Sequence, residues 1–180
     1  MPGSDIIRLT LAATLFVAPA LPVALPVLGA ASPAAAQSSC DRWTSDVWEV
    51  EGGEAMTASV CAKGPAERPA QLYLQCWEPG SFALTFDDGG SGTPPGDDYE
   101  YKGTFVFSSG GTRVEKELAF MAMDGVMVAD IKADEPLATL LAGDGPLTVS
   151  PPGPDFVEAT FPLSGAREAI AAVAADCAAQ

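Results

Sequence analysis

The sequence predicts a mainly β protein, an antiparallel β-sandwich or barrel-like fold with a short helix and a C-terminal α-helix, stabilised by disulfide bonds. Apolar and polar residues alternate with a period of two through most of the chain after Cys40, as they do in half-buried antiparallel strands. Turns rich in glycine and proline separate these runs at close intervals. An even number of cysteines, 4, follows a segment with the features of an export signal, which favours disulfides.

Residues 1–36 have the features of a cleaved signal peptide. A weakly basic start leads into a long apolar stretch, and Ala34 and Ala36 fit the small-x-small pattern before a cleavage point. Prolines interrupt the apolar stretch, which disfavours the alternative of a transmembrane anchor. We therefore expect residues 37–180 to form a single β-rich domain that is periplasmic or secreted.

The charge of the chain restricts its partners. Nine basic and 24 acidic residues give a net charge of −15. Such a surface repels phosphate backbones and anionic lipid headgroups. We therefore expect no nucleic-acid partner and no stable membrane insertion after signal cleavage. Solubility explains the acidity most simply, and a basic partner or a divalent cation is the sharper alternative.

The strands are predicted by their alternation. In "AQLYLQC", Leu72, Leu74 and Cys76 point to one face and the residues between them to the other. The expected strands before residue 87 are "DVWEVE", "EAMTASVC", "AQLYLQC" and "SFALTF". From residue 99 onward, the expected strands are "YEYKGTFVF", "TRVEKELAFMA", "MDGVMV", "PLTVS" and "DFVEATF".

The pair Asp124-Gly125 indicates a two-residue hairpin turn. Apolar residues on both sides of this turn, in "LAFMAMDGVMVA", predict a central hairpin that is buried on both faces. The alternative is an exposed interaction surface whose methionines adapt to a partner.

The region from Asp87 to Glu100, "DDGGSGTPPGDDYE", is expected to be a long surface loop. It has no apolar aliphatic residue and is rich in Gly, Pro and Asp, the usual loop and turn residues. Asp87, Asp88, Asp97, Asp98 and Glu100 offer oxygen ligands for calcium. Their spacing matches no EF-hand loop, so we favour a solvated loop over a calcium site.

Two helices are expected. In "DEPLATLLAG", Glu135 or Asp134 is the cap, Pro136 lies in the first turn and Gly143 ends the helix. The last helix begins at Ser164, a plausible N-cap. Its buried stripe is predicted to consist of Ala166, Ile170, Val173 and Cys177, which are spaced by four, three and four residues.

The cysteines Cys40, Cys61, Cys76 and Cys177 allow three disulfide connectivities. Cys61 and Cys76 flank a Gly-Pro and Arg-Pro turn region between two expected strands, which suggests a bond across a hairpin. Cys40 and Cys177 would then join the two ends of the domain, which often lie close together. We expect this pairing.

The sequence shows no motif of a known catalytic site. It contains 0 histidines, which removes His-based triads and ordinary His-based metal sites. A nucleophile elbow and a Walker loop are also missing. We therefore expect no catalytic residues, no cofactor and no metal. A catalytic pair of carboxylates stays an open alternative, because acidic residues are abundant.

Trp43, Trp48 and Trp77 lie near cysteines in the N-terminal half of the chain. They could form a platform for a sugar or a peptide, but core packing beside a disulfide is the more common role of such residues.

The end of the chain, "PLATLLAGDGPLTVS…ATFPLSGAREAIAAVAADC", resembles the end of a group of small exported bacterial envelope proteins. One branch comprises accessory proteins associated with type VI secretion, and another comprises the invasion-associated locus B proteins. The segment "ASVCAKG…QLYLQCWEPGSFALTF" is similar to the first branch. The middle of this sequence lacks the tryptophan segment that is usual in that branch. It implies an exported β-sandwich module that acts by binding.

These observations lead to three functional hypotheses. The first is a non-catalytic periplasmic binding or accessory protein that contacts another envelope protein. The second is a small secreted envelope hydrolase or hydrolase inhibitor, with "AKGPAERPA" between Cys61 and Cys76 as an inhibitory loop. The third is a calcium-dependent adhesin-like module that uses the loop 87–100.

Overall fold

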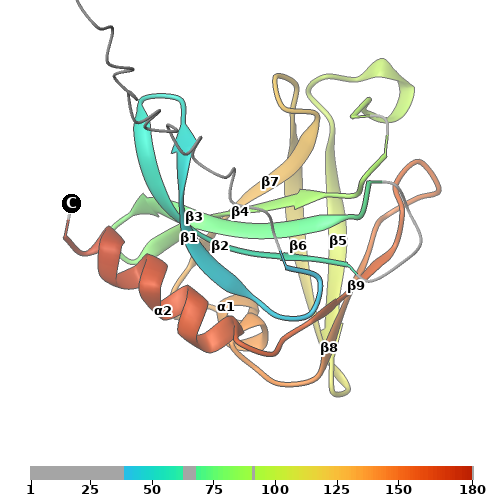
Figure 1. The fold of residues 1–180 in the computed structure, drawn as a ribbon. Helices are drawn as coiled ribbons and strands as arrows, with labels where there is room; N and C mark the ends of the chain where they lie inside the picture. The colour runs from blue at the N-terminus through green and yellow to red at the C-terminus, as the bar shows by residue number, and fades with distance from the viewer. Residues whose placement is uncertain (1–38, 63–67, 91, 180) are drawn as a thin grey trace, which may run out of the picture. The chain divides into compact units, whose positions relative to one another are not determined.

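The computed structural model describes residues 39–62, 68–90 and 92–179. The predicted signal peptide lies outside the described residues, and everything that follows concerns the compact unit Ala35–Gln180 (Figure 1).

The described residues form nine strands and two α-helices. The strands are β1 (Thr44–Val50), β2 (Gly53–Cys61), β3 (Gln71–Glu78), β4 (Ser81–Asp87), β5 (Lys102–Ser109), β6 (Thr112–Met121), β7 (Val126–Lys132), β8 (Pro146–Ser150) and β9 (Ala159–Pro162). The helices are α1 (Pro136–Leu141) and α2 (Ala166–Cys177), and a short 3₁₀ turn, η1, covers Pro95–Asp97.

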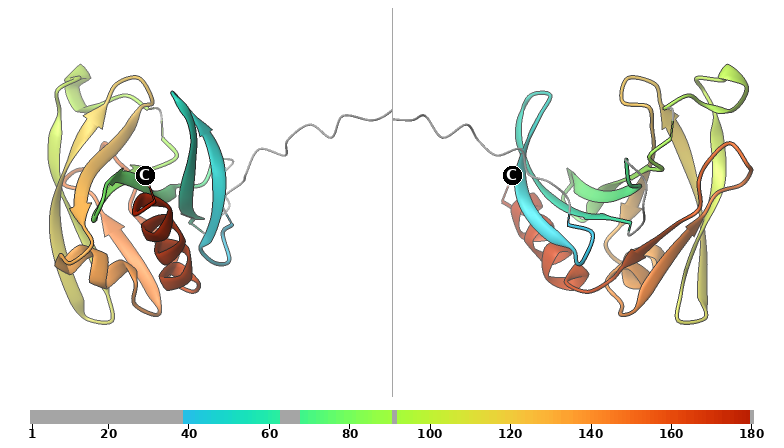
Figure 2. Two further views of the ribbon diagram at one scale, coloured as in Figure 1. Left: turned by 90° about the vertical axis from the view of Figure 1, so that its left-hand side faces the viewer. Right: turned by 45° about the vertical axis from the view of Figure 1, so that its right-hand side comes forward.

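All nine strands belong to one antiparallel sheet in the order β1-β2-β3-β4-β7-β6-β5-β8-β9. The sheet folds over on itself, so that β9 contacts β2 from the far end of the strand order. Figure 2 shows the two halves of the sheet facing each other. The mainly β, sandwich-like prediction is therefore confirmed, together with its C-terminal helix and its disulfides.

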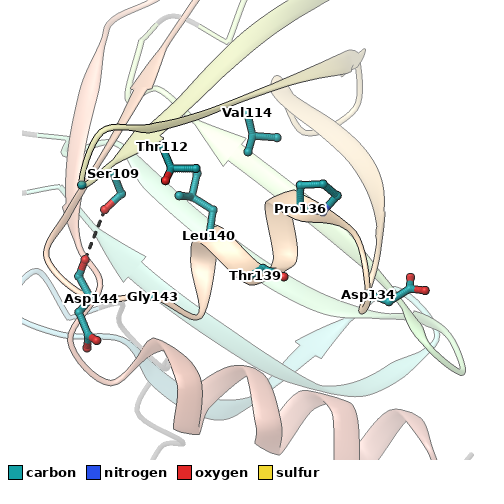
Figure 3. Close-up of a pocket in the computed structure, with 10 residues that line it drawn as sticks. Ser109, Thr112, Val114, Asp134, Pro136, Thr139, Leu140, Gly143 and Asp144 are labelled. Carbon is teal, nitrogen blue, oxygen red and sulfur yellow. Dashed lines mark hydrogen bonds between the residues drawn. The ribbon is translucent and has the colours of Figure 1, made fainter.

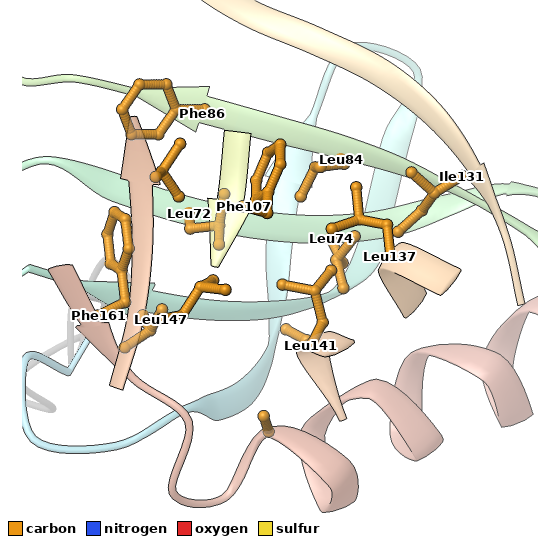
Figure 4. Close-up of a cluster of buried hydrophobic side chains, with 14 of the residues drawn as sticks. Leu72, Leu74, Leu84, Phe86, Phe107, Ile131, Leu137, Leu141, Leu147 and Phe161 are labelled. Atoms are coloured by element: carbon orange, nitrogen blue, oxygen red, sulfur yellow. The ribbon is translucent and has the colours of Figure 1, made fainter. Parts of the chain in front are cut away.

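The core lies between the inner faces of the two halves. Phe86 of β4 is fully buried, and its ring lies 5.7 Å from the ring of Phe105 and 6.3 Å from that of Phe161, both in edge-on geometry. Leu72 and Leu74 extend the cluster along β3, as their alternation predicted (Figure 4). This apolar contact between distant strands is the main driving force for the fold.

Helix α2 packs against β1, β2 and β3. Its buried residues are Ala166, Ala169, Val173 and Cys177. The predicted stripe is thus right at three positions, whereas Ile170 lies at its margin and is only partly buried. The alanines permit a close approach of the helix to the sheet.

Ser164 is not the N-cap of α2, which corrects the expectation from the sequence. The cap is Gly165, in the left-handed region with φ of 78°, and no side chain caps the helix. The Ser164 hydroxyl donates instead to the carbonyl of Asp41 at 3.1 Å, and the Ser164 carbonyl accepts from the Trp43 amide at 2.9 Å. These bonds join the start of α2 to the segment that precedes β1.

Helix α1 packs against β5, β6 and β7 and begins as expected, with Glu135 as N-cap and Pro136 in the first turn. The Glu135 side chain makes no capping bond. Its carboxylate accepts a hydrogen bond from Lys116 Nζ at 2.9 Å, in a partly buried ion pair that ties α1 to β6.

The four cysteines form two disulfides, but the predicted pairing is wrong. The bonds are Cys40–Cys61 and Cys76–Cys177. Cys61 stands opposite Gln71 in the β2–β3 register, five residues from Cys76 along β3. Cys76 shares the inner face with Leu72 and Leu74, whereas Gln71 lies on the other face. Distance and face therefore both separate Cys61 from Cys76.

The turn at Asp124-Gly125 lies where predicted, between β6 and β7. Its loop has four residues rather than two, because Met121 pairs with Val126. The hairpin is not buried on both faces, so this expectation from the sequence is wrong. Met127 is buried, but Met121 is 42% exposed and Met123 at the tip is 88% exposed.

Candidate functional site

The outer face of the sheet carries a concavity that is lined by residues of β1, β2, β3, β4, β6 and β7. We call it the outer groove. In Figure 1 and in the right-hand view of Figure 2, the β1–β2 hairpin stands on one side and the β6–β7 hairpin on the other, with β3 and β4 crossing between them. The cavity between these hairpins has a volume of about 610 Å³.

The floor of the outer groove follows from the strand register. Tyr73 stands opposite Thr85, and Gln75 stands opposite Ala83. Thr85 in turn stands opposite Val128 of β7. Because partners in register share a face of the sheet, these five side chains line one continuous surface across β3, β4 and β7.

The walls of the outer groove come from the two hairpins. Val50 and Ala55 line the β1–β2 side, and Met121 and Val126 line the β6–β7 side. Each of these residues lies on the outward-facing side of its hairpin, and each is apolar although it faces away from the core. A surface of this kind on a sheet is typical of an interaction site.

Buried hydroxyl groups hold the floor in place. Gln75 Nε2 donates to Thr57 Oγ1 at 2.9 Å, and Thr57 is fully buried on this outer face. Tyr73 forms a side-chain hydrogen bond with Thr85 and packs against Trp48 with ring centroids 5.4 Å apart. The floor is therefore pre-organised by polar contacts as well as by packing.

Tyr73 also reports on the electrostatics of the outer groove. Burial is the largest effect and raises the pKa of its phenol above the ordinary value, and the hydrogen bond with Thr85 offsets part of this. The carboxylates of Asp124 and Asp87 raise the pKa further. The negative charge of Asp124, at the tip of the β6–β7 hairpin, therefore acts on the floor of the groove.

The charged residues that line the outer groove are all acidic among the residues that the structure describes. They are Glu51 on one wall and Asp124 and Asp130 on the other side. Trp77 also lines the groove and is 64% exposed. The site thus combines an apolar and aromatic surface with carboxylates, and no Lys or Arg is among its described lining residues.

Trp77 follows Tyr73 and Gln75 on the outward-facing side of β3, as alternation along the strand requires. The β3–β4 register shifts between Cys76 and Glu78, so Trp77 is also the extra residue of a β-bulge. The sequence favoured core packing for Trp77, which is wrong, because Trp77 lies exposed at the mouth of the groove. Trp43, by contrast, is 1% exposed and belongs to the core, as expected.

A second cavity, of about 530 Å³, lies between the β5–β6 turn and α1 (Figure 3). The Ser109 hydroxyl donates to the Asp144 carbonyl across it at 3.3 Å. Its two carboxylates, Asp134 and Asp144, lie at opposite ends and do not point toward one another (Figure 3). A glycosidase needs two carboxylates on either side of one bond, and this cavity does not offer them.

The carboxylates of the loop 87–100 make internal contacts. Asp87 accepts a 2.7 Å hydrogen bond from Arg68 in an ion pair. Asp88 accepts from the amide of Val157 at 3.1 Å, which ties the loop to the segment before β9. Among the described residues, no cluster of three acidic or cysteine side chains could hold a metal ion. The described geometry gives the calcium hypothesis no support.

Most of the expected inhibitory loop falls outside the described residues, which omit 63–67. No protein family model, curated protein or solved structure matches the chain. The resemblance to exported envelope proteins stays a prediction, and the function has to be inferred from the site.

Proposed function

We propose that the protein is a non-catalytic, exported binding protein that contacts another envelope protein through the outer groove. The observation that carries this proposal is the groove itself, a pre-organised cavity of about 610 Å³ on the outer face of a sheet, where apolar and aromatic side chains face away from the core. A protein whose only task was to be soluble would place polar side chains there.

Export is supported by the two disulfides, since such bonds persist in oxidising compartments. We place the protein in the periplasm or outside the cell, after removal of residues 1–36. None of the described helices is long and apolar enough to cross a membrane.

A role in binding without catalysis is supported by the chemistry of the groove. The chain has 0 histidines, so the most common general base at neutral pH is missing. The hydroxyls of the floor are occupied, because Thr57 and Thr85 form hydrogen bonds with Gln75 and Tyr73. Within the part of the chain that the structure describes, no carboxylate or amine forms a hydrogen bond with either hydroxyl that would make it a nucleophile.

Site-directed photocrosslinking tests the proposal. A photo-reactive aromatic amino acid replaces Trp77 at the mouth of the groove or, as control, Glu117 on the outer face of β6. Both positions are exposed, so neither replacement disturbs the core. The oxidised protein is irradiated in native envelope extract, and adducts are identified by mass spectrometry.

We expect a discrete envelope protein to be crosslinked from position 77 and not from position 117. An additional Ala83→Trp substitution, which fills the floor, should remove this adduct. The same adducts from both positions, or an adduct that survives filling of the floor, would rule out the groove as the contact surface.

A further inference from the structure

We infer that the occupant of the outer groove is an extended protein segment that carries alternating apolar and basic side chains. This inference rests on the proposed function and adds the chemistry of the partner. It depends on three features of the groove, namely its charge, its apolar floor and its extent across the sheet.

Charge complementarity identifies the basic component. Glu51, Asp124 and Asp130 are exposed and line the cavity on its two sides. No Lys or Arg is among the described residues that line it. An incoming cation therefore meets carboxylates on both sides, whereas an acidic segment is repelled by them and by the net charge of −15.

The floor identifies the apolar component. Ala83 and Val128 present short apolar side chains between the walls, next to the aromatic ring of Tyr73. Side chains such as valine or leucine bury their surface there without displacing the groups that form hydrogen bonds. The exposed indole of Trp77 adds a π surface that favours a guanidinium or ammonium group. Apolar and cationic contacts thus occur within one site.

The extent of the groove favours an extended chain. Its lining runs from Val50 of β1 to Met121 of β6, which lie five strand spacings apart in the sheet order. At about 4.8 Å per spacing, this corresponds to ~24 Å, which accommodates about six or seven residues of extended chain. In such a chain successive side chains point to opposite sides. One set can face the apolar floor while the other points away from it, toward the rim where Glu51 and Asp124 are exposed in the two hairpin turns.

The test uses four defined probes and the oxidised full-length protein. The first is a six-residue peptide that alternates Arg and Val. The matched peptides replace Arg by Glu, or Val by Ser, and spermidine represents a small polycation. Binding is measured by titration calorimetry and by tryptophan fluorescence, at low and at moderate salt.

We expect saturable binding of the Arg-Val peptide, at least tenfold weaker binding of the Arg-Ser peptide and spermidine, and none of the Glu-Val peptide. The double substitution Asp124→Asn and Asp130→Asn should weaken binding by about 2- to 25-fold, because each exposed charge pair contributes up to about fivefold. Trp77→Ala should weaken it by about tenfold or more, as for an aromatic hot spot. Added salt should also weaken it.

Glu117→Gln is the matched control, since it removes one exposed carboxylate from β6 outside the groove and should leave the affinity unchanged. Equal binding of the Arg-Val and Glu-Val peptides, or an affinity that Asp124→Asn and Glu117→Gln change equally, would overturn the inference. Spermidine binding as tightly as the peptide would also overturn it, in favour of a small cation.

The two proposals fail in different ways. If position 77 crosslinks an envelope protein but the Arg-Val peptide does not bind, the groove is a contact surface and the inferred chemistry is wrong. If the peptide binds with the expected dependence on Asp124 and Asp130 but no envelope protein is crosslinked, the chemistry stands and the proposed function is wrong.

Discussion

The Cys76–Cys177 disulfide should be the stronger of the two covalent constraints on the fold. The bond joins β3 to the last residue of α2 and closes a loop of 101 residues, whereas Cys40–Cys61 closes one of 21 residues. In the loop-entropy treatment, these lengths correspond to about 4.7 and about 3.3 kcal/mol of stabilisation. Replacing Cys76 and Cys177 together by alanine should therefore reduce stability by about 1.4 kcal/mol more than replacing Cys40 and Cys61.

The assay is urea unfolding of the two double variants and the wild type under non-reducing conditions, followed by circular dichroism. We expect the lower midpoint for the variant that lacks Cys76 and Cys177. Titration with a thiol reagent provides the matched control, because each double variant should retain one intact disulfide and no free thiol. Two free thiols in either variant, or a lower midpoint for the variant that lacks Cys40 and Cys61, would refute this reasoning.

Three further predictions concern the floor of the groove, the core and a turn. Tyr73 has a raised pKa in the folded protein, so its stabilising contribution is complete below about pH 10 and is lost as pH rises through the folded pKa. In urea denaturation, the Tyr73→Phe variant should therefore lose less of its free energy of unfolding above pH 10 than the wild type does. Phe86→Ala should lower the free energy of unfolding by about 3–5 kcal/mol, as measured by urea denaturation, and a loss below about 1 kcal/mol would contradict its placement in the core. Gly125 has φ of 67°, and a Cβ there would lie 2.9 Å from Gly92, so Gly125→Ala should lower the melting temperature, whereas Met123→Ala at the same exposed tip should not.

Local patterns in the sequence predict the strands well because each pattern reflects one face of a sheet. The alternation of Leu72 and Leu74 is visible without any knowledge of the partner strand, and it continues as the inner face of β3. The pairing of Cys61 depends on the register between β2 and β3, which places it opposite Gln71. Register is a property of two strands and of the loop between them, so the disulfide pairing could not be read from spacing alone.

The outer groove was only partly predictable for a similar reason. Trp77 and the tip methionine Met123 were noticed in the sequence, and for both the more common buried role was preferred. Trp77 continues the outward-facing series of Tyr73 and Gln75 near the end of β3, and the four-residue loop exposes Met123. The alternation of Tyr73 and Gln75 with Leu72 and Leu74 indicated that these two residues face away from the core, but the concavity arises from the curvature of six strands. A single strand gives no sign of that curvature.

The most direct test of a groove for a basic, apolar segment is to locate bound peptide by nuclear magnetic resonance. The unlabelled Arg-Val peptide is titrated into the oxidised ¹⁵N-labelled protein, and amide shifts are mapped on the structure. We predict that the largest shifts fall on the floor and walls of the outer groove, at Gln75, Ala83, Val128 and their neighbours. Shifts concentrated around the cavity beside α1, near Leu140, or spread evenly over the acidic surface would contradict the account.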